Sequence, residues 1–276
     1  MMKRIVFCLW EKYKVFSENE REHVKKVEIS RKYLHLFQEY KHSIPVIHST
    51  LEGQYEGKLF VDSEKETQAA ILFTRFAFHF VAGNPEIENI VDVLDEVIFQ
   101  QYLPESGENE AVVFCPNQKW GNVLDKVFER HHGIKEDRKI FRLNKDKYKE
   151  AQTDRINLLG VRKTLRYEQE NGANKKYPVC RIMDDEECIS WCSGFMLGNG
   201  HAEIDVFTKE EYRGKGYGKE VSISLINELL KHNIEPDWCT WPYRVESEKL
   251  ARSLGYELVQ VAPAHIWVEE KDKERQ

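Results

Sequence analysis

The stretch Asp205–Glu220, DVFTKEEYRGKGYGKE, decides the fold because it places three glycines at alternate positions between a strand and a helix. Ala202–Thr208 supplies the strand, and Tyr217–Lys231 has the apolar spacing of the helix. Glycine lets the backbone turn tightly and expose successive amides without a Cβ in the way. The start of the helix adds free N–H groups and the positive end of its dipole. The segment therefore predicts a cradle for a diphosphate, with a plain strand-to-helix turn as the alternative.

Two common nucleotide loops do not fit this segment. A P-loop, G-x-x-x-x-G-K-[ST], requires a glycine where Arg213 stands and a hydroxyl residue where Glu220 stands. A Rossmann turn, G-x-G-x-x-G, lacks its third glycine whether it is counted from Gly214 or from Gly216. The pattern that fits is R-x-x-G-x-G, formed by Arg213, Gly216 and Gly218.

With its flanks, this pattern resembles the GNAT acyltransferase superfamily. It follows the strand AEIDVFT, opens a helix with one apolar face, and is followed by a further strand, DWCTW. The segment ESEKLARSLGYE is similar to the family's closing helix and turn, and the resemblance covers Tyr177 to Tyr256. More narrowly, the run C-S-G-F…AEI…T…YRGKG…W…S-x-x-L-A-x-x-L-G-Y is similar to the zwittermicin A resistance-type subfamily, in which a degenerate first half precedes the working domain.

The resemblance implies acetyl-CoA as co-substrate and no metal. Backbone groups of the strand's last residues would pair with the pantetheine arm, and amides of the glycine loop would hold the pyrophosphate. Ser247 matches a small polar position of the family. The cofactor-binding residues implied in this way are Val206, Phe207, Thr208, Arg213, Gly214, Lys215, Gly216, Tyr217, Gly218, Lys219 and Ser247.

The implied reaction is direct attack of a substrate amine on the acetyl thioester. An alkyl amine with a pKa of ~10.4 is protonated at neutral pH, so freeing its lone pair costs about 4–5 kcal/mol and a general base is needed. Glu203 and Asp205 alternate with apolar residues on the predicted strand and project to one face. Glu203 matches the subfamily's AEI position and is the favoured base, with Asp205 as the second catalytic candidate. The alternative is an exposed strand face of ordinary solvated acids.

The leaving thiolate needs less assistance than the amine. Many GNAT enzymes place a Tyr on the last helix as general acid, whereas this chain has Ala251 there. A thiol pKa of ~8.5 lies only about 1.5 units above neutral pH, so unassisted departure costs little. Tyr243 is the third catalytic candidate, with packing at a strand end as its alternative role. Arg244 stands where relatives have Asn, and it either reaches a CoA phosphate or points to solvent.

Together these features predict an acetyl-CoA-dependent N-acetyltransferase that acts on a small-molecule primary amine. A non-catalytic acyl-CoA-binding sensor or scaffold is the alternative, because the family's Tyr and Asn are both replaced. The identity of the amine is open, and so is the oligomeric state, with a homodimer as one option.

The chain predicts two tandem GNAT-like halves, residues 1–150 and 151–276, in an α/β fold with a mixed sheet. In each half a hairpin with an acidic turn precedes a strand, a long helix, a Cys-bearing strand and a second helix. We interpret the repeat as a diverged internal duplication; the alternative is that any two α/β units look alike when only the order of their elements is compared. The predicted strands are Gly57–Ser63, Gln68–Phe76, Phe78–Ala82, Ala111–Cys115, Lys139–Leu143, Pro178–Met183, Ile189–Leu197, Ala202–Thr208, Trp238–Trp241 and His265–Val268. The predicted helices are Glu18–Tyr40, Glu86–Gln101, Trp120–Arg130, Ile156–Glu170, Tyr217–Lys231 and Glu246–Leu254.

The two halves differ where the phosphate loop should be. In the first half, the strand Phe78–Ala82 runs through Gly83-Asn84-Pro85 straight into a helix, with no arginine or glycine series. The first half is therefore predicted to be degenerate, completing a shared sheet and walling a substrate cleft. The polar stretch Asn144–Arg155 is the predicted boundary between the halves.

Composition limits the partners. The 276 residues carry 41 Lys and Arg against 47 Asp and Glu, and the net charge of −6 is spread without a basic stripe, which argues against nucleic acid. The six cysteines have no secreted-framework spacing, and Cys188-x3-Cys192 has no second Cys or His pair near it for zinc. No apolar run approaches the ~20 residues of a membrane span, and the N-terminus does not resemble a signal peptide. We therefore expect a cytoplasmic protein without membrane partners.

Overall fold

The computed structural model describes residues 24–153, 155–169 and 173–269. The first half contains β1 (Lys25–Val27), η2 (Arg31–Phe37), α1 (Ile44–Leu51), β2 (Gly57–Val61), β3 (Ala69–Thr74), β4 (Phe78–Gly83), α2 (Ile90–Asp95), the π-helical η3 (Glu96–Tyr102), α3 (Leu103–Ser106), β5 (Glu110–Phe114), α4 (Gln118–Glu129), β6 (Ile134–Leu143) and α5 (Lys145–Ala151). The second half contains β7 (Arg162–Glu168), β8 (Tyr177–Asp184), β9 (Glu187–Gly198), β10 (His201–Thr208), η4 (Glu210–Tyr212), α6 (Tyr217–Lys231), β11 (Glu235–Thr240), α7 (Val245–Ser253) and β12 (Tyr256–Val268).

The strands form one mixed sheet in the order β1-β2-β3-β4-β5-β12-β6-β11-β10-β9-β8-β7. In the first half, η2 and α1 pack on one face of the sheet, and α2, α3 and α4 cover the other. In the second half, α6 packs against β8, β9 and β10 over a separate core. Every residue of β3 is buried, as expected for a strand covered on both faces. The predicted architecture of two tandem α/β halves is confirmed.

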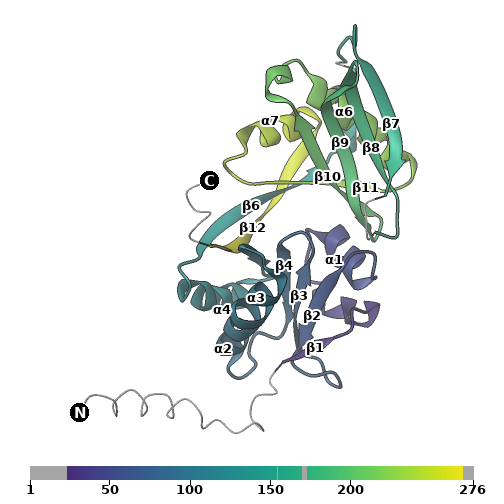
Figure 1. Ribbon diagram of the computed structural model, residues 1–276. Helices are drawn as coiled ribbons and strands as arrows, with labels where there is room; N and C mark the ends of the chain where they lie inside the picture. Colours follow the sequence, from purple (N-terminus) through teal and green to yellow (C-terminus); the bar gives the residue numbers. More distant parts are fainter. Residues whose placement is uncertain (1–23, 154, 170–172, 270–276) are drawn as a thin grey trace, which may run out of the picture.

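The two halves exchange strands through β6 and β12. These strands pair antiparallel over ten residue pairs, from Tyr256↔Leu143 to Ile266↔Ile134. The last part of β12 also pairs with β5 of the first half, while β6 pairs with β11 of the second half. Figure 1 shows the β6/β12 ribbon running from one half to the other. Each half of the sheet is therefore completed by a strand from the other half.

The ribbon also joins the two cores. Ile140 of β6 packs into the first-half core, and its neighbour Phe141 packs into the second-half core. Both side chains are fully buried. Because successive residues of a strand point to opposite faces, one strand supplies an apolar side chain to each core.

Two predicted helices are corrected. Within the described part of Glu18–Tyr40, the structure has β1 and a 3₁₀ helix in place of one long helix; residues 18–23 lie outside the described residues. Within the described part of the expected helix Ile156–Glu170, the structure has the edge strand β7, which pairs with β8 over seven residue pairs; Glu170 lies outside the described residues. Most residues of β7 are exposed, so no apolar period identified it as a strand. The polar boundary after Leu143 forms the helix α5, whose Tyr148 is buried and donates from its hydroxyl to Ile223 O at 3.0 Å.

The strands that were predicted are otherwise found, but two of them are longer. β6 begins at Ile134 and β12 at Tyr256, well before the short apolar runs that indicated them. Neither added stretch alternates polar and apolar residues: 134–138 of β6 has four consecutive charged residues, and 256–264 of β12 is mixed. Their pairing with each other, rather than a local pattern, makes them strands.

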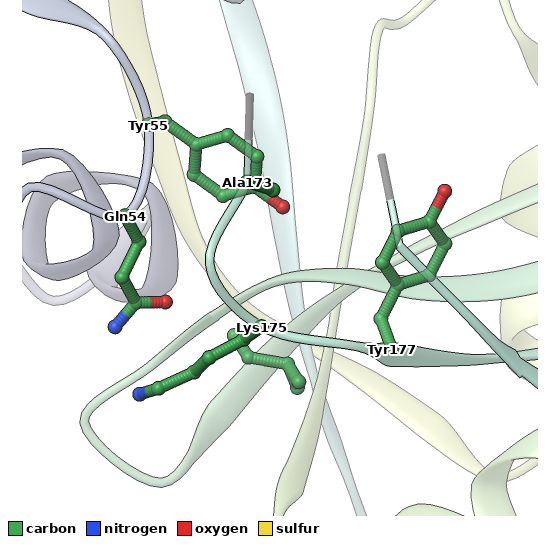
Figure 2. Close-up of a pocket in the computed structure, with 6 residues that line it drawn as sticks. Gln54, Tyr55, Ala173, Lys175 and Tyr177 are labelled. Carbon is green, nitrogen blue, oxygen red and sulfur yellow. The ribbon is translucent and has the colours of Figure 1, made fainter. Parts of the chain in front are cut away.

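The halves also meet beside α1. Figure 2 shows Gln54 and Tyr55, just after α1, on one side of a shallow hollow, with Lys175 and Tyr177 of the second half on the other. Asn174 Nδ2 donates to Gly53 O at 3.3 Å across this contact. Gly198 permits the approach of α1, because a Cβ there would lie 2.5 Å from Pro45 O. The hollow is a surface between the halves rather than an enclosed cavity.

We expect the chain to unfold as one cooperative unit, because neither half of the sheet is complete alone. Phe141→Ala leaves a cavity in the second-half core and should destabilise the protein by about 3–5 kcal/mol. In hydrogen exchange with mass spectrometry, protection should fall in β3 as well as in β9. Val261→Ala, on the same ribbon but 45% exposed, is the control and should change little. Loss of protection in β9 alone would contradict this cooperativity.

Candidate active site

The candidate site lies where β10 and β11 separate. These parallel strands pair over only three residues each, ending at Glu203↔Asp237. β10 continues to pair with β9 as far as Thr208. In the described residues, no strand pairs with the other edge of β10 after Glu203. Backbone groups along such an edge need another partner, so this edge can accept an extended ligand.

The predicted pantetheine residues lie along this free edge. Val206 is half-buried against the second-half core, and Phe207 is 44% exposed and stacked on Trp191 with ring centroids 6.2 Å apart. The Thr208 hydroxyl is 2.8 Å from that of Ser190. Ser190 Oγ also donates to Phe207 O at 3.0 Å. An exposed aromatic on an edge that no strand covers is the surface that an arm with both amide and alkyl groups requires.

The glycine loop begins directly after this edge. Gly214 and Gly216 have φ angles of 73° and 85°, in the left-handed region that favours glycine. A Cβ on Gly216 would also lie 2.6 Å from the Ile156 side chain. α6 has no side-chain cap at Gly216, and Glu220 N donates to Gly216 O at 3.1 Å. The amides of the residues before Glu220 are thus the helix donors that have no intrahelical acceptor.

Cationic side chains flank the loop. Arg213 Nε donates to Thr208 O at 3.2 Å, so the arginine ties the loop back to the end of β10. Lys215 Nζ lies 4.8 Å from the centroid of the Tyr212 ring. Tyr217, Gly218 and Lys219 form the first turn of α6. The structure therefore brings the predicted pyrophosphate residues together on one loop and helix start.

Glu220, which excluded a P-loop, has a structural role. Its side chain is 4% exposed and forms ion pairs with Arg155 and with Lys163, the latter at 2.6 Å. Burial alone would raise the pKa of Glu220, but hydrogen bonds from Arg155 and Lys163 outweigh burial and hold this pKa below its usual value. The buried carboxylate connects the segment before β7, through Arg155, and β7 itself, through Lys163, to the first turn of α6.

The residues after β11 differ in their surroundings. Ser247 Oγ accepts a hydrogen bond from Trp238 Nε1 at 3.2 Å, so its hydroxyl is oriented by the core. Tyr243 is 64% exposed, which excludes the alternative of a packed aromatic at the strand end. The Arg244 guanidinium lies 5.7 Å from the Tyr243 ring centroid. Ala251 is fully buried.

The two candidate carboxylates lie in different environments. Glu203 is 8% exposed at the last paired position, whereas Asp205, beyond the separation of the strands, is exposed. Partial desolvation raises the pKa of Asp205. Asp205 is therefore exposed, as the alternative of an ordinary solvated acid expects, whereas Glu203 is buried and does not fit that alternative.

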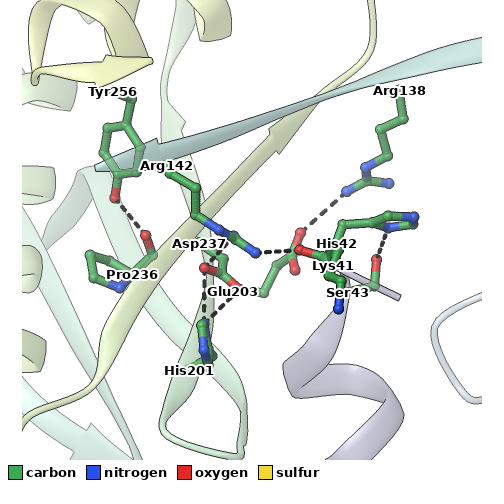
Figure 3. Close-up of polar contacts among 10 residues, drawn as sticks. All are labelled: Lys41, His42, Ser43, Arg138, Arg142, His201, Glu203, Pro236, Asp237 and Tyr256. Atoms are coloured by element: carbon green, nitrogen blue, oxygen red, sulfur yellow. Dashed lines mark hydrogen bonds and ion pairs between the residues drawn. The ribbon is translucent and has the colours of Figure 1, made fainter. Parts of the chain in front are cut away.

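Glu203 belongs to a charge cluster between the halves, shown in Figure 3. Its Oε1 lies 3.4 Å from Arg138 Nη2 of β6. Its cross-strand neighbour Asp237 accepts from Arg142 Nη1 at 2.5 Å and lies 3.1 Å from His201 Nδ1. Two arginines on one face of β6 therefore meet two acids of the second half, and we call these four residues with His201 the inter-half charge cluster.

Burial dominates the electrostatics of Glu203. Desolvation raises its pKa, the positive charge of Arg138 opposes this effect, and the negative charge of Asp237 adds to it. The nearby His42 is buried, and desolvation together with Arg138 and Arg142 lowers its pKa to about 3. His42 is therefore neutral at physiological pH. A carboxylate with a raised pKa is suited to accept a proton near neutral pH.

The corresponding place in the first half is filled. β4 and β5 are parallel and pair only over Phe78–Phe80. The Tyr40 hydroxyl lies 2.6 Å from Val81 O and 2.9 Å from Phe114 O, bridging the strands where they separate. Tyr40 is 5% exposed. This buried tyrosine occupies the space that an extended ligand would need, as the predicted degeneracy of this half requires.

Sequence reasoning missed the cluster residues contributed by β6. Arg138 and Arg142 share a face with the buried Ile140, and cations beside an apolar residue on one strand face were the available signal.

In the described part of the chain, no group of three or more His, Cys, Asp or Glu is placed to hold a metal ion. No helix there is long and apolar enough to cross a membrane. The five cysteines of the described residues are free thiols.

Comparison with known proteins gives concordant matches. The family model described as GNAT acetyltransferase matches twice, over residues 34–177 and 174–263. An "Uncharacterized N-acetyltransferase YdfB" from Bacillus subtilis (strain 168) is 22% identical over 229 residues, covering 77% of this chain and 86% of the relative.

Solved structures share the fold over most of the chain. A GCN5-related N-acetyltransferase-like protein from Streptococcus suis 89/1591 has a TM-score of 0.63 at 22% identity, with 86% of this chain and 97% of that chain covered. A tandem GNAT protein from the clavulanic acid biosynthesis pathway has a TM-score of 0.59 at 8% identity, with 89% and 98% covered. The two-half arrangement is thus found in these proteins as well.

The buried Glu220 predicts a pH-dependent stability. Its folded-state pKa lies below the unfolded value of ~4.3, so its contribution is present above that pH and is lost as the pH falls through the folded pKa. Glu220→Gln should destabilise the protein by about 2 kcal/mol at pH 7, and the difference should shrink at acidic pH. Denaturant unfolding of both proteins at pH 7 and below pH 4 measures this. A difference that stays constant with pH would contradict the assignment.

Proposed function

Since this chain belongs to the GNAT acetyltransferase family, we propose that it is an acetyl-CoA-dependent N-acetyltransferase that acetylates the primary amine of a small molecule. One observation carries the proposal: the free edge of β10 joins an uncapped helix start at one end and a buried carboxylate at the other. The helix start would hold the diphosphate, the edge of β10 the pantetheine arm, and the carboxylate would face the amine, in that order from α6 back along β10.

The cofactor would lie along β10. Backbone groups of Val206–Thr208 would pair with the amides of pantetheine, and Phe207 would contact its alkyl carbons. The amides from Gly214 to Lys219 would hold the pyrophosphate, with the helix dipole of α6 favouring its negative charge. Arg213, Lys215 and Lys219 add positive charge around the same position. In this direction the thioester would lie toward Glu203.

Glu203 would act as the general base. It takes a proton from the substrate ammonium, and the free amine nitrogen then attacks the thioester carbonyl. The C–N bond forms and the C–S bond breaks, so that CoA leaves as a thiolate, and the second amine proton passes from the nitrogen to solvent water. Because the pKa of Glu203 is raised, the difference between it and the pKa of the substrate ammonium is smaller, and the first proton transfer costs less free energy.

The thiolate would leave with little assistance. Ala251 is fully buried at the family's usual Tyr position, so α7 presents no acid there. Tyr243 is exposed beyond the end of β11 and can donate a proton to the thiolate from its hydroxyl. The resemblance to the zwittermicin A resistance-type subfamily supports a small-molecule acceptor over a protein.

Acetyl-CoA should stabilise the protein. At a concentration 100 times Kd, linkage gives about 2.7 kcal/mol, or a rise in melting temperature of about 5 °C for a chain of this size. Gly214→Trp should abolish the rise by covering the loop. Gly200→Trp is a matched control, because its φ of 76° is close to the 73° of Gly214 and neither glycine has a neighbour within 4 Å of an added Cβ. Differential scanning fluorimetry measures all three proteins.

The outcomes separate the two functions considered above. A rise that Gly214→Trp loses and Gly200→Trp keeps supports the cofactor site. Stabilisation without CoA release for any amine in a panel would favour an acyl-CoA sensor or scaffold. No stabilisation by acetyl-CoA in the wild type would exclude both.

Removing the general base should slow turnover without loss of cofactor binding. Glu203→Gln should lower kcat/KM for the amine by about 10²- to 10⁴-fold while the melting shift with acetyl-CoA is retained. Asp205→Asn, two residues along the same strand but exposed, should change kcat/KM little. Thiol release assayed with each variant tests this. A larger loss in Asp205→Asn than in Glu203→Gln would reverse the assignment.

A further inference from the structure

Arg138 is built into the contact between the halves. It lies on β6 of the first half and is 8% exposed. Its guanidinium carbon is 4.4 Å from the ring centroid of Phe78 in the first half and 5.1 Å from that of Trp241 in the second. Cation–π contacts with aromatic rings of both halves fix the position of the charge.

The hydrogen bonding of Arg138 is incomplete. Its Nε and Nη1 atoms are buried without a hydrogen-bond partner, and Nη2 contacts Glu203 at 3.4 Å. Arg142, four residues along the same strand face, instead donates to Asp237 Oδ1 and to Lys41 O, each at 2.5 Å. Burying a guanidinium with so few partners costs free energy that an apolar side chain would not. Arg142 has the bonding of a structural ion pair, and Arg138 does not.

We propose that Arg138 is a positioning residue, which holds the Glu203 carboxylate in place and in its charged form where β10 and β11 separate. The inference rests on the proposed function, because it assigns Glu203 the role of general base. It gives the first half a direct part in the acceptor site: the exchanged strand β6 delivers a cation that the second half does not itself supply there.

The charges around Glu203 support this role. Arg138 and Arg142 face it from β6, Asp237 and Cys239 face it from β11, and neutral His42 lies beside Arg138 from the loop before α1. Burial and Asp237 both favour the protonated acid, and Arg138 is the strongest opposing charge. Without Arg138, Glu203 would keep its proton up to a higher pH, so at a given pH a smaller fraction of the protein would carry the ionised carboxylate that accepts the proton of the amine.

The test measures the protonation of Glu203 directly. The Cδ resonance of Glu203 in ¹³C-labelled full-length protein, assigned by its loss in Glu203→Gln, reports the pKa without any need for turnover. Arg138→Met should raise this pKa by about one pH unit or more. The acidic limb of the kcat/KM profile should move to higher pH by the same amount, about tenfold in rate per unit along the limb. Arg138→Lys, which keeps the charge, should lie between the two.

Arg142→Met is the matched control on the same strand face. It removes two hydrogen bonds of a structural ion pair, so it should lower the melting temperature and move the Glu203 pKa less than Arg138→Met does. Arg138→Met should leave the melting temperature unchanged or raised. An unchanged Glu203 pKa in Arg138→Met would overturn the proposal. A raised pKa in a protein that acetylates no amine would support the role of Arg138 while refuting the proposed function.

Discussion

The pairing of β6 with β12 is the interaction on which the rest of the structure depends. Ten antiparallel residue pairs join the strands, and each strand then completes the sheet of the opposite half. This exchange brings β6 beside β11, and only for that reason do Arg138 and Arg142 face Glu203 and Asp237. A backbone constraint between distant parts of the chain therefore sets the electrostatics of the candidate site.

The features that sequence predicted well are local. The glycine loop and the bounds of α6 follow from left-handed backbone at Gly216 and from apolar spacing within one helix, neither of which needs a distant partner. The edge strand β7 and the full length of β12 were missed because pairing with other strands, not local preference, determines them. Arg138 was missed for the same reason, since its partner is defined only once β6 is known to lie beside β11.

The two halves show how one architecture can carry a site or lack it. Both contain a pair of parallel strands that separate after three paired residues. In the first half Tyr40 closes the opening with a hydroxyl that lies within hydrogen-bond distance of a carbonyl oxygen on each strand, and a buried hydroxyl that donates to a carbonyl is stable. In the second half the opening stays free and leads to an uncapped helix. The difference depends on a few side chains rather than on the fold.

The strand exchange also explains why a half without a phosphate loop remains necessary. Removing it would leave β11 without β6 on one edge and would leave much of β12 unpaired, so the second half could not keep its own core closed around Phe141. Because stability requires the first half to stay paired with the second, the surface of the first half that faces Glu203 is a fixed part of the site. A cation on that surface can then set the charge of a buried acid without being subject to the constraints of cofactor binding, because Arg138 and the glycine loop lie on different elements.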